Sequence, residues 1–184
     1  REMTQDFDLR IDGKPVQIES GNLTLTFDTA NDGFTAVIEC DMNEQPDLYN
    51  LITPYKGPTA QVYLDGALKL TGKLTRVDPS KSADGTKYGL HGWSNTFNFV
   101  DSVLQPPYAY EDRTIHSLAI LAGRQTNTKV NHTGPNLDKF ARATVVPGMT
   151  GFQFIAPLAQ QRDHVVSSTS DVIILLQQPD RKST

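Results

Sequence analysis

Residues 61–78 constrain the fold more than any other stretch, because apolar and polar side chains alternate there on both sides of Asp65-Gly66. An Asp-Gly pair suits the positive φ angles of a tight hairpin turn, and a period of two is typical of a strand with one buried face. The pattern therefore predicts a two-stranded hairpin. The side chains expected near a core are Val62, Leu64, Leu68, Leu70, Leu74 and Val77.

Further strands are predicted on both sides of this hairpin. Residues 7–19 form a second candidate hairpin around Asp12-Gly13, and residues 23–28 and 33–41 are rich in Thr, Val, Ile and Phe, which favour strands. Residues 87–93 return as one more strand after a turn. A closed or nearly closed barrel would bury one face and remove exposed sheet edges. We therefore expect a small antiparallel β-barrel over residues 1–104.

The pattern changes after the Pro-Pro pair at 106–107. Residues 114–123 carry an apolar stripe and end in glycine, which predicts a helix with Thr114 or Asp112 as its N-cap. A second helix is predicted over residues 151–162, where Pro157 either starts the helix or kinks it.

The last part of this segment predicts a strand pair, residues 165–166 with residues 172–176. The chain is therefore expected to be mainly β, with a compact α/β segment at 105–178 and a tail at 179–184.

Composition and charge exclude several function classes. The net charge is −4 and the basic residues are scattered singly, whereas nucleic-acid or anionic-membrane binding needs a clustered positive field. The longest apolar run, residues 172–176, is far shorter than the roughly 20 residues that cross a bilayer. Cys40 is the single cysteine and lies in a strand pattern, which favours a buried inert thiol. Proteins or neutral ligands are the expected partners.

The residue patterns predict no catalytic, cofactor-binding or metal-binding site. His91, His116, His132 and His164 are far apart in the sequence and lack the spacing of a zinc motif. Glu39 and Asp41 could in principle act as an acid–base pair on a glycan, but alternation places both on the solvent face of a strand. The common nucleophile, dinucleotide and phosphate-loop motifs are absent.

An aromatic series leads into the Pro-Pro joint and has two interpretations. It could be an exposed recognition surface, or its rings could seal the end of the barrel against the helices; the second interpretation is favoured. The series comprises Trp93, Phe97, Phe99, Tyr108 and Tyr110.

The order of these elements resembles the baseplate hub proteins of contractile-tailed phages, of the phage Mu and late-control type, which are related to the hub of the type VI secretion spike. The likeness covers about residues 5 to 178, and its weight lies in the order in which degenerate motifs appear. The motifs are Phe-Thr-Ala-Val-Ile at 34–38, Pro-Tyr-Lys-Gly-Pro at 54–58, Val-Tyr-Leu-Asp-Gly at 62–66, Leu-Thr-Gly-Lys-Leu-Thr-Arg-Val at 70–77, residues 88–101, Thr-Ile-His-Ser-Leu-Ala-Ile-Leu-Ala at 114–122, and residues 151–166.

The resemblance implies a non-enzymatic structural protein of the virion, made in the host cytoplasm and needing no cofactor. It implies a homotrimeric ring at the tip of the tail tube, with the tail tube protein above, the central spike protein below and other baseplate proteins around it. Each subunit would present two related barrels, so that three chains match a six-fold tube. The second barrel does not lie within these residues, so the chain is expected to be part of a longer protein.

Subunit and tube contacts are expected at strand edges near 62–70 and in the loop 42–58. Polar side chains that point outward from one face, such as Lys69, Thr71, Lys73 and Thr75, would suit the lumen of a ring. The candidate interface residues are Val62, Leu64, Leu70, Pro54, Tyr55, Lys56 and Trp93.

Two other function classes stay open at the level of sequence. The first is a carbohydrate-binding β module, in which Trp93, Tyr108 and Tyr110 would stack on sugar rings. The second is a glycan hydrolase that uses Glu39 and Asp41, which ranks last because no positioned acid–base pair is evident.

Overall fold

The computed structural model describes residues 6–26, 30, 32–41, 45–53, 57–82, 85–134, 138–170 and 172–177. Two compact units are formed: the barrel unit, residues 1–25 and 32–95, and the α/β unit, residues 26–31 and 96–184. The border lies after Asn95 and not after residue 104, because Phe99 and Leu104 are buried in the core of the α/β unit.

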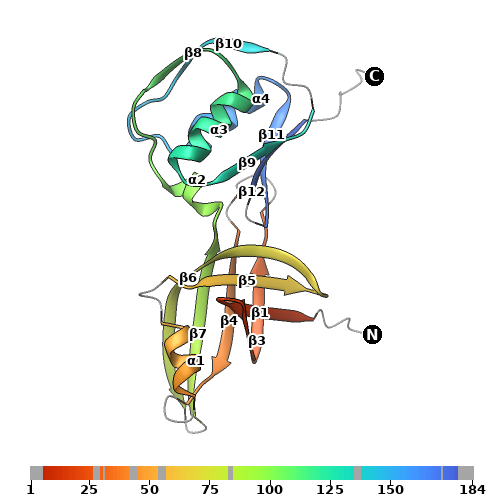
Figure 1. Ribbon diagram of the computed structural model, residues 1–184, viewed down its shortest axis with the longest axis vertical. Helices are drawn as coiled ribbons and strands as arrows, with labels where there is room; N and C mark the ends of the chain where they lie inside the picture. The colour runs from red at the N-terminus through yellow and green to blue at the C-terminus, as the bar shows by residue number, and fades with distance from the viewer. Residues whose placement is uncertain are drawn as a thin grey trace. The chain divides into compact units, whose positions relative to one another are not determined.

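The barrel unit is a curled half-barrel of antiparallel strands (Figure 1), so the expectation of a mainly β fold is confirmed. Within the described residues its strands lie in the order β2-β1-β5-β6-β7-β4-β3, with β2 and β3 at the two edges. The elements are β1 (Phe7–Ile11), β2 (Lys14–Val16), β3 (Ser20–Thr24), β4 (Gly33–Glu39), α1 (Pro46–Leu51), β5 (Thr59–Leu64), β6 (Ala67–Ser82) and β7 (Gly85–Ser94).

Both predicted Asp-Gly hairpins are confirmed, and each turn also binds the neighbouring hairpin. Asp12 and Gly13 have φ of 48° and 77°, and Asp65 and Gly66 have 50° and 77°, which is the left-handed geometry of a tight hairpin turn. Oδ1 of Asp12 accepts a hydrogen bond from the Thr59 amide at 2.8 Å, and Oδ1 of Asp65 accepts one from the Asp6 amide at 3.0 Å. The turns therefore hold β1 against β5.

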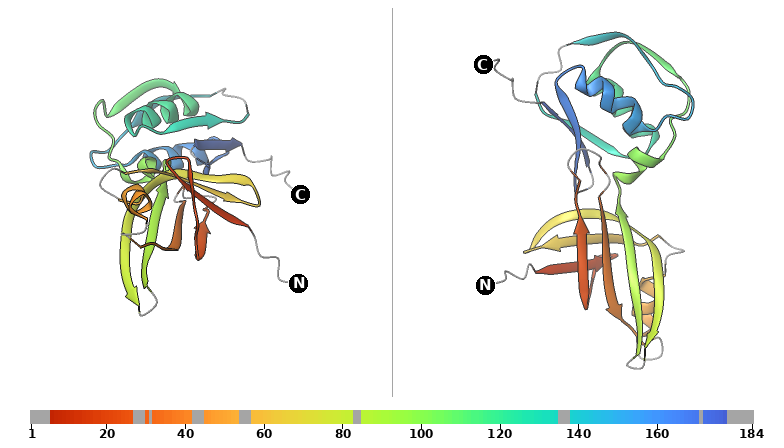
Figure 2. Two further views of the ribbon diagram at one scale, coloured as in Figure 1. Left: turned by 60° about the horizontal axis from the view of Figure 1, so that its bottom comes forward. Right: turned by 180° about the vertical axis from the view of Figure 1, so that it is seen from behind.

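Strand β6 bends strongly, because its two halves pair with different strands of the curled sheet (Figure 2). Its first part pairs with β5 and its second part with β7. Gly72 lies where the two pairings overlap, opposite Ala60 and Ser94. A Cβ on Gly72 would lie 1.9 Å from the carbonyl oxygen of Trp93, so only glycine allows this close approach of two backbones.

A β-bulge makes one sequence prediction wrong. Val62 pairs with Leu70, but Tyr63 pairs with Leu68, so one residue of β6 is extra at this point. The extra residue shifts the alternation, since side chains switch faces at every residue of a strand. Leu68, expected near the core, is therefore 41% exposed, whereas Leu70 is fully buried.

Helix α1 lies inside the stretch that the sequence assigned to a loop, residues 42–58. The helix begins at Pro46, which has a fixed φ suited to a first helical turn. Leu48, Tyr49 and Leu51 pack against the core of the barrel unit, and the Tyr49 ring meets Tyr88 edge to face. The core that they cover consists of Leu9, Ile11, Val16, Phe34, Ala36, Ile38, Cys40, Ile52, Ala60, Val62, Leu70, Leu74, Tyr88 and Leu90.

The α/β unit contains the two predicted helices and the predicted hairpin. Strands β11, β12 and β9 form one sheet, in which β12 and β9 run parallel, while β8 and β10 form an antiparallel ribbon. The sequence did not predict β8, β9 or β10. The elements are α2 (Phe97–Asp101), β8 (Ala109–Thr114), α3 (Ile115–Gln125), β9 (Lys129–His132), β10 (Lys139–Thr144), α4 (Gly151–Gln160), β11 (His164–Thr169) and β12 (Val172–Gln177).

Side-chain caps fix the starts of the two long helices. Thr114, and not Asp112, caps α3, because its hydroxyl accepts a hydrogen bond from the Ser117 amide. Thr150 and Gln153 form a reciprocal capping box at the start of α4, and Pro157 lies inside that helix. Helices α3 and α4 then pack against each other. In the described part of the chain, no helix is long and apolar enough to span a membrane.

Candidate functional site

The outward face of the curled sheet carries the side chains of the barrel unit that best suit contact with another protein. We call it the outer face and define it by Arg10, Tyr63, Lys73, Asp78, His91 and Trp93. Trp93 is 39% exposed, and a Cβ on Gly33 would lie 2.8 Å from its ring, so the indole covers that glycine. The guanidinium carbon of Arg10 lies 4.7 Å from the centre of the Tyr63 ring. Aromatic and arginine side chains of this kind are enriched in protein interfaces.

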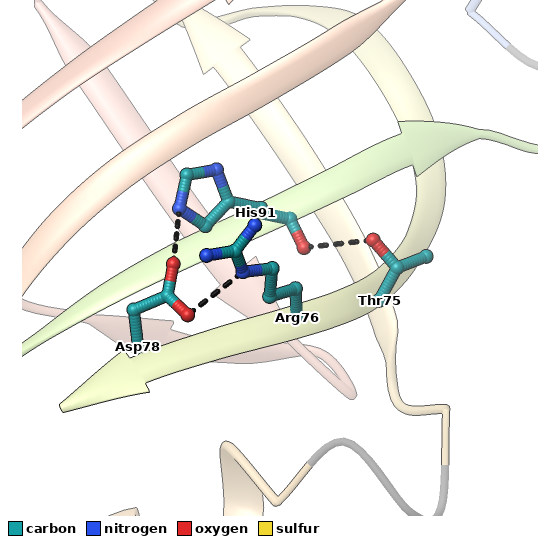
Figure 3. A network of polar contacts seen from close by, with 4 residues as sticks. All are labelled: Thr75, Arg76, Asp78 and His91. Carbon is teal, nitrogen blue, oxygen red and sulfur yellow. Dashed lines mark hydrogen bonds and ion pairs between the residues drawn. The ribbon is translucent and has the colours of Figure 1, made fainter.

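Charged side chains of β6 and β7 continue the outer face beside a bulge in β6 (Figure 3). The two carboxylate oxygens of Asp78 lie 2.7 Å from Nε of Arg76 and 3.1 Å from Nε2 of His91. The hydrogen bond from Arg76 is the main cause that lowers the pKa of Asp78 below its ordinary value of 3.8. All three side chains are substantially exposed, which limits what the ion pairs add to stability.

The pairing of His91 with Asp78 does not form a catalytic triad. A triad needs a hydroxyl or thiol that gives its proton to the imidazole. The hydroxyl of Thr75 donates instead to the backbone oxygen of His91, at 3.2 Å, and not to the ring. The network is therefore a charged patch on the outer face.

The structure separates the predicted interface residues into three groups. Val62 and Leu70 are fully buried in the core of the barrel unit, and Leu64 is half-buried. Trp93 is exposed on the outer face. Pro54, Tyr55 and Lys56 lie outside the described residues. An interface role for these residues stays a prediction, and Trp93 is the large side chain among them that is open to a partner.

The expected free strand edge near residues 62–70 is wrong. Strand β5 pairs with β1 on one side and with β6 on the other, and β6 pairs in turn with β7. The edges of this sheet are β2 and β3. Contact through the middle of the sheet must therefore use side chains of its outer face, such as the exposed Lys69, Lys73 and Thr75 or the half-buried Thr71.

The structure does not bring the candidate catalytic side chains together into one site. Glu39 and Asp41 are both exposed, as the alternation predicts. Cys40 is buried, and burial followed by the charge of Asp41 raises the pKa of its thiol, so it is a poor nucleophile at neutral pH. Among the described residues, no group of three or more His, Cys, Asp or Glu side chains is arranged to hold a metal ion.

The aromatic series does not form a stacking platform for sugars. Phe99 is fully buried in the α/β unit, and Tyr108 and Tyr110 pack against the same core. The Tyr110 ring lies 6.1 Å from that of Phe154, and its hydroxyl accepts a hydrogen bond from Gln125. Phe97 is half-buried, which leaves Trp93 as the exposed ring of the series.

One cluster of side chains is not evident from the sequence. His116, His132 and His164 come together in the α/β unit, although each lies on a different element. Their separation along the chain hides this contact, and the one sequence signal is that His116 lies within the apolar stripe of the helix that begins at Ile115.

Comparison with known proteins shows the fold of the chain. No protein-family profile and no curated protein sequence matches it. Among solved structures, the 43 kDa tail protein of prophage MuSo2 from Shewanella oneidensis superposes with a TM-score of 0.73 at 19% identity, over 94% of this chain and 53% of the other. The tail protein of Neisseria meningitidis MC58 gives 0.75 at 19% identity, over 98% of this chain and 52% of the other.

A more distant likeness is to a VgrG-containing complex. A Francisella PdpA-VgrG complex matches with a TM-score of 0.58 at 10% identity, over 97% of this chain and 29% of the other. The chain spans about half the length of the two tail proteins. Over both its units, therefore, this chain has the fold of phage tail proteins.

Proposed function

We propose that this chain is a structural component of a phage-type tail and forms the hub of its baseplate. In this proposal three copies make a ring, which joins the tail tube to the central spike and contacts other baseplate proteins. The observation that carries the proposal is the fold itself, since a curled half-barrel followed by this α/β unit is shared with two phage tail proteins over nearly the whole chain.

The positions of the candidate catalytic side chains support a structural role rather than an enzymatic one. The described carboxylates, histidines and Cys40 make no aligned nucleophile, base and acid, whereas catalysis needs these groups within hydrogen-bond reach. The outer face, by contrast, offers an exposed indole, an Arg10–Tyr63 contact and a charged network. A closed ring uses two different surfaces of each subunit, and stable interfaces bury about 1,600 Å² in total.

Trp93 is the side chain that we place in the ring contact. It is large and partly exposed, and its ring covers Gly33 on the outer face. Buried Trp side chains often carry most of the binding energy of an interface, and loss of one commonly weakens binding by at least about 2 kcal/mol.

The test is the oligomeric state of the full-length protein, measured by native mass spectrometry and by electron microscopy scored for three-fold rings. Trp93→Ser should shift rings toward monomers while circular dichroism stays unchanged. Ile120→Ser is the matched control, since Ile120 has nearly the same exposure, 38%, but lies in the α/β unit. A full-length protein that sediments as a monomer at high concentration would contradict the proposal.

A further inference from the structure

Three histidines from three elements converge at one end of the α/β unit. His116 lies in the first turn of α3, His132 is the last residue of β9 and His164 is the first residue of β11. The rings of His116 and His132 are stacked, with centres 3.4 Å apart and planes 17° apart, and the His164 ring meets His116 edge to face at 5.6 Å.

The environment of His116 favours a neutral ring. His116 is 2% exposed, and neither of its ring nitrogens has a hydrogen-bond partner among the described residues. Nδ1 of His164 lies 2.5 Å from the carbonyl oxygen of Arg162, which can only accept, so Nδ1 carries the proton. Its buried Nε2 has no partner in the described part of the chain, so a second proton there would be unsatisfied.

Among the residues that the structure describes, no group is placed to compensate a positive charge on His116. Its position in the first turn of α3 puts it at the positive end of the helix dipole. Helix α4 and strand β12 carry no ionisable side chain, and β9 and β11 contribute His132 and His164. The other ionisable groups of α3, β8 and β9 are exposed, apart from the half-buried Tyr110: Glu111, Asp112, Arg113, Arg124 and Lys129.

The pKa of His116 is accordingly lowered from 6.5 to about 4, first by burial and then by the neighbouring His132 and His164. Protonated His116 and His132 could not stay stacked at this distance, because like charges in contact repel strongly. A charge on buried His116, whose ring nitrogens have no partner among the described residues, is also costly, so protonation favours a state in which this ring reaches water. His132 is exposed and ends a four-residue edge strand, so it can move with the least disruption.

We propose that His116, His132 and His164 form an acid-sensitive latch, which holds the end of β9 against α3 at neutral pH and releases it when the cluster is protonated. The amide of Thr133, directly after β9, reports this motion because it donates to the carbonyl oxygen of Leu175 in β12 at 2.9 Å. Release of β9 would expose this amide to exchange with solvent.

The experiment is amide hydrogen exchange followed by NMR on the whole chain at pH 7.5 and pH 5.5, corrected for the intrinsic exchange rate. An opening that returns His116 to its ordinary pKa becomes roughly tenfold easier between these two pH values, so protection of the Thr133 amide should fall roughly tenfold. The Ser94 amide, bound to the carbonyl oxygen of Asp32 in the barrel unit, serves as an internal control and should keep its protection.

Two variants separate the latch from general acid sensitivity. His116→Phe keeps an aromatic ring in the stack but removes the proton site, and it should abolish the tenfold fall. His91→Gln, which changes the histidine outside the cluster, should retain it. An unchanged protection of Thr133 in the wild type would overturn the proposal, and so would a fall that persists in His116→Phe.

A measurement on the wild type alone covers the case in which His116→Phe does not fold. The contact between the His116 and His132 rings gives a nuclear Overhauser effect at pH 7.5, which should be lost by pH 3, below the pKa of folded His116 of about 4. A contact that persists at pH 3 would overturn the proposal. Protection of Thr133 that rises with equimolar Zn²⁺ would also overturn it, because the cluster would then be a metal site.

Discussion

The bulge in the β5–β6 hairpin leaves one leucine buried and another exposed, so substitutions at the two positions should differ in their effect on the free energy of unfolding. Leu70 is fully buried and Leu68 is 41% exposed, although strict alternation would place both on the same face. Leu70→Ala removes about 2.4 kcal/mol of transfer free energy and leaves a cavity, so it should destabilise the barrel unit by about 3 to 4 kcal/mol. Leu68→Ala opens no enclosed cavity and should cost about 1 kcal/mol or less.

The chain contains a single tryptophan, so urea unfolding followed by Trp93 fluorescence reports on the barrel unit alone. With a slope of about 1 to 2 kcal/mol per M, Leu70→Ala should lower the midpoint by roughly 2 M and Leu68→Ala by about 0.5 M. The difference of about 2 kcal/mol corresponds to roughly 30-fold in the unfolding equilibrium. Equal losses in the two variants would refute the bulge and restore the simple alternation.

Further perturbations test the α/β unit and the outer face. Thr150→Ala removes the capping box with Gln153 and should destabilise the α/β unit by about 1 kcal/mol, measured from exchange of the α4 amides; no change would show that the cap is dispensable. Arg76→Ala should raise the pKa of Asp78 toward 3.8 in a carboxyl NMR titration, because the largest lowering cause is lost. His116 binds a proton less readily in the folded state, with a pKa of about 4 against 6.5. Stability should therefore be complete above pH 6.5 and fall by about 3 kcal/mol as the pH drops to 4, and His116→Phe should flatten this part of a thermal denaturation profile.

Local patterns in the sequence predicted much of the fold. The Asp-Gly turns, the two long helices and the β11–β12 hairpin follow from residues close together in the chain, because turn geometry and periodicity are local properties. The bulge beside Tyr63 was missed, since an extra residue in one strand is defined only by its partner strand. Helix α1 was missed because its six residues are too few to show a period.

Long-range contacts were not predictable from such patterns. Strand β8 pairs with β10, which is separated from it by α3 and β9, and neither strand shows a clear alternation. The histidine cluster forms where His116 of α3 meets His132 of β9 and His164 of β11. The three histidines are far apart in the sequence, so their spacing does not reveal this contact. The candidate interface residues were only partly informative, because alternation identified Val62 and Leu70 as inward-facing but could not say which outward side chains meet a partner.

The discontinuity of the α/β unit has an evolutionary consequence. The chain passes between the two units at 25/26, 31/32 and 95/96. Ala30 belongs to the short segment 26–31 of the α/β unit and is fully buried in the core of that unit. Its carbonyl oxygen accepts a hydrogen bond from the buried hydroxyl of Thr96. One recombination event at 95/96 would therefore deliver an incomplete C-terminal unit to its recipient, so exchange between related genes should carry both units together.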